Sequence, residues 1–290
     1  MNLENTGKNK LKIILSKKMG FCFGVKKSVN LAENALKVEK NNLYMLGSII
    51  NNPQVIEYFI EKGVKITDNL DEIPEESTVI TRAHGISPTM LKRAYQKRLS
   101  VIDTTCPYVR KVQKIARYLY EKDYFIIVYG DKKHPEVLSL LDTVQNNALV
   151  INSIFDAEKI TKKKKIGFIS QTTKNIYDFY KLSSALLDRA EELRIFNTIC
   201  NSTTERQKSV LELAKEVDMI LVIGGKESAN TTRLAEICRN QGVKTYHIEN
   251  KNQLKSKWFH PEDKVGITSG ASTPDWVTNE VIDKLKEYYG

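Results

Sequence analysis

The chain has 290 residues, enough for two or three small domains with cores of their own. Hydrophobic residues make up 41% and charged residues 28%, an ordinary soluble composition, and no apolar run approaches the roughly 18 residues of a membrane span. The net charge of +10 fits a lysine-rich surface, an anionic small substrate or nucleic acid, and charge alone does not separate these. The first ten residues lack the apolar core of a signal peptide, so we expect a cytoplasmic protein without membrane contact.

Short β-branched runs alternate with amphipathic helical stretches along the chain. In residues 25–39, for example, Val25, Val29, Ala32 and Leu36 share one helix face. Strands are expected at residues 12–16, 43–47, 64–67, 78–81, 101–105, 124–130, 148–152, 165–170, 194–199, 219–225, 244–248 and 265–270. This alternation predicts parallel sheets covered on both faces, which bind ligands at the carboxyl ends of their strands.

A three-fold repeat is visible in the spacing of the polar residues that follow the strands. Each third of the chain holds a cysteine, a polar loop 28 or 29 residues later and another 62 to 72 residues later. The positions are Cys22, Asn51 and His84, then Cys106, His134 and Thr172, then Cys200, Ser228 and Ser272. Such self-similarity marks a repeated supersecondary unit, and three units could meet around a pseudo-three-fold axis. We expect α/β units at residues 11–106, 107–199 and 200–290, after a polar extension at 1–10.

Three of the four cysteines, Cys22, Cys106 and Cys200, each follow a predicted strand and precede a helix. A helix N-terminus stabilises a thiolate, the form that binds metal, and soft sulfur ligands favour iron–sulfur clusters or zinc. Three thiolates fit a cubane with one iron open to substrate, while zinc held by three cysteines and a histidine is the structural alternative. Cys238 lies mid-helix among apolar residues, so we expect a buried core thiol there.

The other polar loops hold groups for anion binding and proton transfer. His84 and His134 occupy corresponding loops, and both could bind an anion. Glu136 is either an ordinary carboxylate at a helix start or a proton donor beside the metal. Thr172 is either a helix cap or a hydroxyl of the site. Donors suited to phosphate oxygens stand at two more predicted helix starts: Ser228 and Asn230 at one, and Ser272 at the other.

Eight short motifs, in this order, resemble those of the 4-hydroxy-3-methylbut-2-enyl diphosphate reductase (IspH/LytB) family of isoprenoid synthesis. They are GFCFGV, the AHG of TRAHG, DTTCP, HPEV, QTT, the C-x-x-T-x-x-R-Q of Cys200–Gln207, the Ser-x-Asn of KESAN, and GASTPD. The match covers about residues 11–290, and the motifs together are very specific. The resemblance implies a trefoil of three α/β units, with mostly parallel sheets, around a central iron–sulfur cluster.

Carried over by position, the resemblance implies that Cys22, Cys106 and Cys200 hold a 4Fe–4S cluster with one open iron. It implies reductive removal of the allylic hydroxyl of the substrate, which gives isopentenyl and dimethylallyl diphosphate in the last step of the non-mevalonate pathway. Electrons would come from a ferredoxin or flavodoxin. Glu136 would donate a proton, and Thr172 would support the hydroxyl end. The residues implied to bind the diphosphate are Asn51, His84, His134, Ser228, Asn230 and Ser272.

Two positions depart from the family pattern. The family has His-Asn where this chain has Asn51-Asn52, and it often has Ser-Ser-Asn where this chain has Ser228-Ala229-Asn230. We expect both departures to affect affinity more than activity. The chain ends at Gly290 as in single-module members, so we expect no nucleic-acid-binding domain, and a monomer or weak dimer.

Two alternatives belong to other functional classes. A quinolinate-synthase-like dehydratase would also use three cysteines, three-fold architecture and an open iron, but the HPEV, QTT and Ser-x-Asn loops argue against it. A basic RNA-binding protein with structural zinc would need aromatic residues interleaved on a basic strand, or an RNA motif, and the sequence has neither. There is also no P-loop, HExxH, GxSxG or GxGxxG motif.

Overall fold

The computed structural model describes residues 11–39 and 42–289 of the chain. The polar extension expected at residues 1–10 lies outside the described residues. By its internal contacts the chain divides into two compact units. The first unit joins the N-terminal segment up to Phe21 with residues 205–290, and the second covers Cys22–Thr204.

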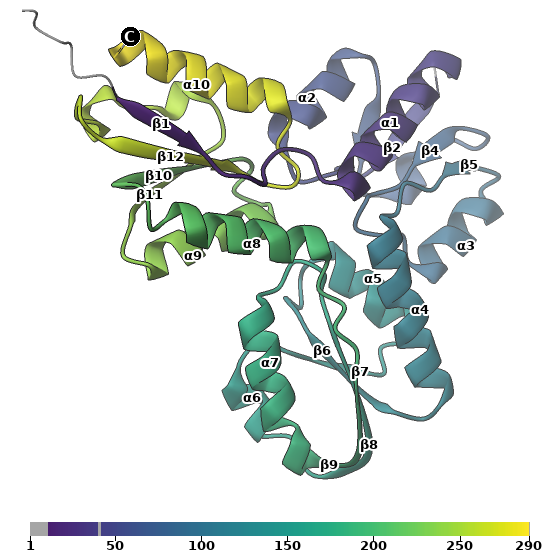
Figure 1. The fold of residues 1–290 in the computed structure, drawn as a ribbon. Coiled ribbons are helices and arrows are strands. Elements are labelled where there is room, and N and C mark those ends of the chain that lie inside the picture. The colour runs from purple at the N-terminus through teal and green to yellow at the C-terminus, as the bar shows by residue number, and fades with distance from the viewer. Residues whose placement is uncertain (1–10, 40–41, 290) are drawn as a thin grey trace, which may run out of the picture. The chain divides into compact units, whose positions relative to one another are not determined.

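The described strands form three four-stranded sheets, and all of their pairings are parallel (Figure 1). The second unit holds the sheets β3-β2-β4-β5 and β7-β6-β8-β9, and the first unit holds β11-β10-β12-β1. The strands are β1 (Lys12–Leu15), β2 (Leu43–Leu46), β3 (Lys65–Thr67), β4 (Thr78–Ile80), β5 (Ser100–Ile102), β6 (Phe125–Tyr129), β7 (Ala148–Ile151), β8 (Lys163–Ser170), β9 (Ala190–Ile195), β10 (Met219–Ile223), β11 (Lys244–Ile248) and β12 (Lys264–Ser269). The prediction of three α/β units with parallel sheets is confirmed.

The strand order is the same in all three sheets, which gives the repeat a structural basis. The cysteine-bearing connection always leaves the last strand in this order, which is β5, β9 or β1. The strand before Cys22 is β1, and it pairs with β12. It is therefore an edge strand of the sheet that also contains β10, β11 and β12. Residues 12–15 thus do not join the sheet of the expected 11–106 unit. The three domain boundaries themselves stay a prediction.

Proline fixes the start of four helices. The helices are α1 (Phe23–Val38), α2 (Pro53–Glu61), α3 (Pro88–Gln96), α4 (Pro107–Glu121), α5 (Pro135–Thr143), α6 (Ile154–Glu158), α7 (Ile176–Ala185), α8 (Asn201–Leu213), α9 (Ala229–Asn240) and α10 (Asp275–Tyr289). Proline suits the first helical position, and it keeps the preceding residue extended. Cys106 and His134 therefore stand as N-caps, outside the helices that follow them.

The sheet β7-β6-β8-β9 is covered by helices on both faces, as parallel sheets require. On one face, Phe168 of β8 stacks on Phe179 of α7 with ring centroids 4.8 Å apart. On the other face, Ile126 and Val128 of β6 belong to a core with Leu119 of α4. The helices that carry the site residues at their N-termini are thus anchored by buried apolar contacts.

Two sequence predictions differ from the structure. The strand expected at 194–199 lies at Ala190–Ile195 instead, because half of this edge strand is charged and its apolar pattern is weak. Residues after it form the approach to Cys200. Helix α6 was not predicted; it is short and begins with a capping box made by Ser153 and Asp156.

Candidate functional site

The three predicted cluster ligands stand at the starts of three helices. Cys22 is the N-cap of α1, and its Sγ accepts a hydrogen bond from the Val25 N–H at 3.4 Å. Cys106 is the N-cap of α4. Cys200 directly precedes α8, and its carbonyl oxygen accepts from the Thr203 N–H at 2.9 Å. All three lie in the second unit, although the chain separates them by more than 80 residues each.

The packing around Gly24 brings two of these thiols together. A Cβ atom at Gly24 would lie 2.4 Å from the Cys106 Sγ and 4.0 Å from the Cys22 Sγ. Burial raises the pKa of the Cys106 thiol to about 11, and the Cys22 and Cys200 thiols act in the same direction. The Cys22 and Cys200 thiols therefore both lie within electrostatic reach of the Cys106 thiol. In Cys106, burial outweighs the stabilisation of a thiolate that a helix start provides.

Main-chain hydrogen bonds tie two of the cysteines to the polar loops. The Cys106 N–H donates to the Ala83 carbonyl, next to His84, and the Cys200 N–H donates to the Thr172 carbonyl, both at 3.0 Å. Two residues before each cysteine, a threonine hydroxyl bridges to the end of the neighbouring strand. Thr104 Oγ1 donates to the Thr81 carbonyl, and Thr198 Oγ1 to the Ser170 carbonyl, each at 2.6 Å.

Glu136 and Thr172 form a buried pair after β6 and β8, at the carboxyl ends of these strands. Glu136 lies in the first turn of α5 and is 1% exposed. Its Oε1 accepts from the Thr172 N–H at 2.7 Å, and its Oε2 accepts from the Thr172 hydroxyl at 2.8 Å. Burial raises the pKa of Glu136 to about 7, against the lowering effect of these hydrogen bonds. The carboxyl group can therefore hold and release a proton near neutral pH.

His84 and His134 also come together in the second unit. Their rings pack edge to face, with centroids 5.2 Å apart. Burial lowers the pKa of His84 to about 3 and that of His134 to about 4, so both are neutral at pH 7. His134 Nδ1 accepts from the Glu136 N–H at 3.2 Å, which assigns the ring proton to Nε2. His84 Nδ1 is buried and has no hydrogen-bond partner within residues 11–39 and 42–289.

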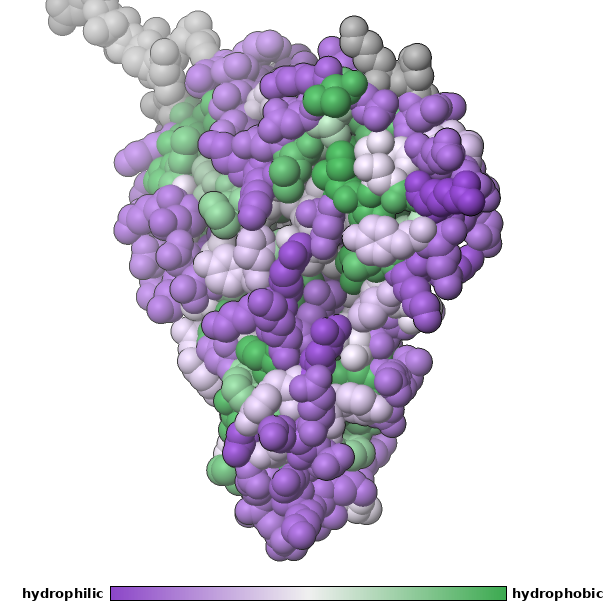
Figure 2. Space-filling view, turned by 90° about the vertical axis from the view of Figure 1, so that its right-hand side faces the viewer, coloured by the Kyte–Doolittle hydropathy of each residue, from purple (hydrophilic) through white to green (hydrophobic). Residues whose placement is uncertain are grey.

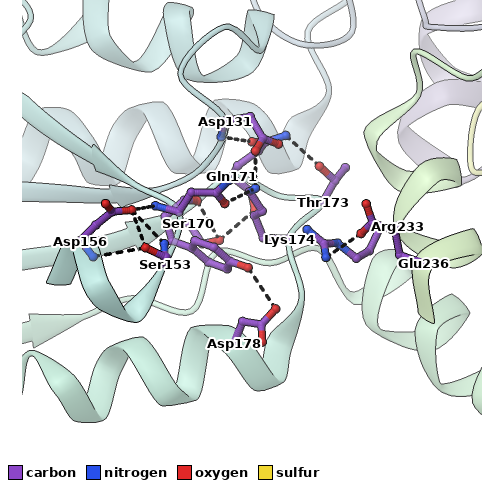
Figure 3. A network of polar contacts seen from close by, with 12 residues as sticks. Asp131, Ser153, Asp156, Ser170, Gln171, Thr173, Lys174, Asp178, Arg233 and Glu236 are labelled. Atoms are coloured by element: carbon purple, nitrogen blue, oxygen red, sulfur yellow. Dashed lines mark hydrogen bonds and ion pairs between the residues drawn. The ribbon is translucent and has the colours of Figure 1, made fainter. Parts of the chain in front are cut away.

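A buried lysine joins the two loops that carry Glu136 and Thr172 (Figure 3). The Lys174 side chain is 3% exposed, and its Nζ contacts Asp131 Oδ1 at 2.5 Å and Asn152 Oδ1 at 2.8 Å. In the same network, Gln171 Oε1 accepts from the Asp131 N–H at 3.0 Å. These contacts fix the loop after β6 against the loop after β8.

The first unit gathers the remaining predicted phosphate donors. Ser228 is the N-cap of α9, and the Ser272 hydroxyl donates to its Oγ at 3.2 Å. Asn230, in the first turn of α9, is 5% exposed. Neither polar atom of its amide has a hydrogen-bond partner in the described part of the chain. A buried, unsatisfied amide beside two hydroxyl groups is typical of a site that a polar ligand completes.

Asn51 lies in the turn before α2, where it is half-buried. Its neighbour Asn52 is the N-cap of that helix and accepts from the Val55 N–H at 3.0 Å. The Asn52 Oδ1 thus serves the fold, while its Nδ2 is buried and has no hydrogen-bond partner in the described residues. Asn51 stays the predicted site residue of this loop.

Two features are absent from residues 11–39 and 42–289. No group of three or more histidine, cysteine, aspartate or glutamate side chains is spaced to hold one metal ion. No helix there is long and apolar enough to cross a membrane. All four cysteines are described, and none forms a disulfide. Cys238 is fully buried in the core of the first unit, as predicted.

Comparisons with known proteins show the family of the chain. The sequence model of a family described as LytB protein matches residues 13–286. The chain belongs to the LytB family. This LytB chain is 42% identical over 277 residues to a 4-hydroxy-3-methylbut-2-enyl diphosphate reductase of Geobacter metallireducens, with 96% of this chain and 98% of the relative covered. A reductase of the same name from Caldanaerobacter subterraneus is 41% identical, with 97% and 98% covered.

Two solved structures resemble the LytB chain over nearly its full length. The E-1-hydroxy-2-methyl-but-2-enyl-4-diphosphate reductase of Plasmodium falciparum matches with a TM-score of 0.90 and 27% identity, covering 94% of this chain and 87% of the other. An (E)-4-hydroxy-3-methyl-but-2-enyl diphosphate reductase, described as the terminal enzyme of the non-mevalonate pathway, matches with a TM-score of 0.71 and 40% identity, covering 96% and 99%.

Sequence reasoning missed two sets of supporting residues. Thr104 and Thr198 hold the approaches to Cys106 and Cys200, and the shared threonine two positions before each cysteine was a usable signal. The pair of Lys174 and Asp131 had no such signal, because a lysine and an aspartate 43 residues apart resemble surface residues.

Proposed function

We propose that this chain catalyses the reductive dehydroxylation of 4-hydroxy-3-methylbut-2-enyl diphosphate to isopentenyl and dimethylallyl diphosphate. The reaction takes up two electrons and two protons, breaks the allylic C–O bond and releases water. The observation that carries the proposal is the grouping of Cys22, Cys106 and Cys200 at three helix starts. The names of relatives about 40% identical over nearly the whole chain support the same substrate.

The residues around the cysteines fit a 4Fe–4S cluster. Gly24 leaves out the Cβ atom that would otherwise meet the Cys106 sulfur, so two ligands can face the same space. Cys22, Cys106 and Cys200 would hold the cluster and leave one iron without a protein ligand. When bound, such a cluster supplies electrons to the substrate and a Lewis-acid position for its hydroxyl group.

Glu136 would give a proton to the departing hydroxyl group. A hydroxide is a poor leaving group, and water is a good one, so the proton must arrive as the C–O bond breaks. The raised pKa, about 7, lets the Glu136 carboxyl group carry a proton near neutral pH. Thr172 holds both carboxyl oxygens in place and presents its own hydroxyl beside them.

The two histidines that would bind the diphosphate are uncharged at pH 7 in the free protein. Nε2–H of His134 and the imidazole of His84 suit phosphate oxygens, since a bound anion stabilises the protonated ring. We assign Ser228, Asn230 and Ser272 to the same substrate, together with Asn51. The unsatisfied amide of Asn230 supports its role, because a ligand would supply the missing partners.

The test is an anaerobic purification followed by iron, sulfide and turnover assays. We expect about four irons and four sulfides per chain and reduction of the allylic diphosphate by dithionite-reduced methyl viologen. Each single change of Cys22, Cys106 or Cys200 to Ser should remove the cluster and turnover, because oxygen is a poor substitute for thiolate sulfur.

Cys238→Ala is the matched control and should keep both, since Cys238 lies in the core. Stoichiometric zinc without sulfide, or turnover that survives loss of Cys200, would contradict the proposal. The protein electron donor, a monomeric or weakly dimeric state and a cytoplasmic location stay predictions.

A further inference from the structure

A basic groove of about 630 Å³ lies in the second unit, between α1 and α4. Four cationic side chains line it, together with a single carboxylate, Asp103. The cations are Lys27 of α1 and Arg110, Lys111 and Lys114 of α4. Figure 2 shows the side of the molecule that carries α1, α3 and α4, where the surface is mostly hydrophilic with smaller apolar areas between.

The charges of the groove are not balanced within the protein. Asp103 pairs with Arg110 at 2.7 Å and also accepts from the Thr105 N–H. In the described part of the chain, Lys27, Lys111 and Lys114 have no ion-pair partner, and all three are exposed. An excess of unpaired cations in a groove attracts an acidic surface and speeds its association.

The arrangement of the helices explains how the groove forms. Pro107, Arg110, Lys111 and Lys114 recur at the spacing of one face of α4, while Val112 and Ala116 bury the opposite side. On α1, Phe23, Lys27 and Leu31 lie four residues apart and share a face. Phe23 is 68% exposed, and exposed aromatic side chains often anchor protein interfaces.

The groove adjoins the cysteine positions rather than the loops assigned to the diphosphate. Thr105 and Pro107, which flank Cys106, line it, and the face of α1 that borders it begins directly after Cys22. None of the residues assigned to the diphosphate lines this groove. A partner seated here would lie against the backbone that carries two of the three cluster ligands.

We propose that this groove is the docking site of an acidic electron-carrier protein that reduces the cluster. The inference rests on the proposed function, which consumes two electrons per turnover. A 4Fe–4S cluster takes up one electron at a time, so a one-electron carrier would deliver the two electrons in two encounters. The carrier is oxidised by one electron in each encounter, and the cluster site receives that electron.

The test compares two triple variants with the same change of charge. Lys27→Glu, Lys111→Glu and Lys114→Glu are combined in one protein, and Lys162→Glu, Lys164→Glu and Lys181→Glu, also exposed lysines, in the control. The probe is a reduced acidic ferredoxin at low ionic strength, and reduced methyl viologen is the small donor. We expect the KM for ferredoxin to rise at least about tenfold in the groove variant, since charged patches change association rates by about 10- to 10³-fold. In that variant the KM for ferredoxin should also no longer depend on salt concentration. Viologen turnover and iron content should stay within about twofold of the wild type.

Three outcomes would overturn the docking site. Equal KM values for ferredoxin in the groove variant and the wild type would do so, and so would equal losses in both triple variants. Loss of binding to a short single-stranded RNA with unchanged ferredoxin kinetics would make the groove a nucleic-acid surface instead. A wild-type protein that cannot reduce the allylic diphosphate even with viologen would refute the proposed function, and this result is distinguishable from the other three.

Discussion

Two pairs of loops occupy equivalent positions in two sheets. They differ in whether their polar side chains find hydrogen-bond partners within the protein. After β6 and β8, Glu136 and Thr172 meet, and the carboxyl group accepts two hydrogen bonds. After β10 and β12, the equivalent positions hold Asn230 and Ser272. Ser272 there donates to Ser228, and the amide of Asn230 has no partner within the described residues.

The Glu136 carboxyl group finds its hydrogen-bond partners within the protein, whereas the Asn230 amide would find them on a ligand. A carboxyl group held by two donors keeps one orientation before the substrate arrives, which is what proton transfer needs. An unsatisfied buried amide costs about 1–3 kcal/mol of stability, and a ligand with matching groups can remove that cost. We infer that the first pair of loops serves the chemistry and the second serves binding.

The largest effect is expected from Glu136→Gln. Glutamine keeps the size of the side chain, and its amide can accept from the Thr172 N–H and donate to the Thr172 hydroxyl. It cannot deliver a proton, so turnover should fall by about 10²–10⁴-fold while iron content and substrate affinity remain. Anaerobic turnover assays with reduced viologen measure this. Near-wild-type turnover would mean that Glu136 is only a carboxylate at a helix start.

The pH dependence distinguishes proton transfer from a structural role for Glu136. Burial raises its pKa from 4.5 to about 7, so the protonated donor decreases about tenfold per pH unit above 7. Turnover of the wild type should fall accordingly, and the residual turnover of Glu136→Gln should not. The stability contributed by the neutral carboxyl is fully present below pH 4.5 and is lost as pH rises through about 7. The glutamine variant should therefore gain stability relative to the wild type between pH 5 and pH 8, and a constant difference would contradict the raised pKa.

A smaller effect, on binding alone, is expected from Asn230→Ala. A hydrogen bond to a charged group contributes about 1.5–3 kcal/mol, so the KM for the diphosphate should rise about 10- to 100-fold with little change in kcat. The free protein should be as stable as the wild type or more stable, because the substitution removes a buried amide without partners.

Asn52→Ala is the matched control for this change. Asn52 is also buried, and its Nδ2 likewise has no hydrogen-bond partner in the described residues, but its Oδ1 caps α2, so alanine should cost about 1 kcal/mol of stability. Thermal unfolding of both variants without ligand makes the comparison. If Asn230→Ala destabilised the protein as much as Asn52→Ala does, the contrast between the two pairs of loops would be lost.

Much of the fold follows from local patterns in the sequence. The apolar strand Met219–Ile223 and the helix that begins at Pro107 are set by composition and by proline, and both lie where expected. The equal spacing from cysteine to polar loop predicted the repeat. The place of β1 could not be predicted in the same way. It pairs with β12, about 250 positions away in the chain, and the sequence of a strand does not specify its partner.

The sequence names candidate residues for the site but does not predict their electrostatics. Glu136 could be named from HPEV, yet its raised pKa depends on burial by elements that a local motif does not describe. The same holds for Lys174, whose burial follows from the meeting of two loops. His84 and His134 were expected as anion ligands, and burial makes them neutral in the free protein.

The smallest effect is expected at Asn51, which occupies in the third sheet the position that His134 and Ser228 occupy in the other two. The cap of α2 depends on Asn52, so Asn51→His should leave the fold intact. The new imidazole would add one donor for the diphosphate, and the bound anion would favour its protonated form. We expect the KM to fall by about two- to tenfold, with the larger gain at pH 6 than at pH 8, because the ordinary pKa of histidine is near 6.5.

The reverse exchange in the equivalent loop tests whether the two positions serve the same ligand. In His134→Asn, asparagine is still a good N-cap for α5, so the helix should persist while the donor at Nε2 is lost. The KM should then rise, and combining it with Asn51→His should restore part of the loss, because either loop would bind the same anion. A KM that rises tenfold in Asn51→His alone would show instead that Asn51 has a role of its own, which an imidazole cannot fill. In that case the three sheets would share their strand order but not the use of their first polar loop.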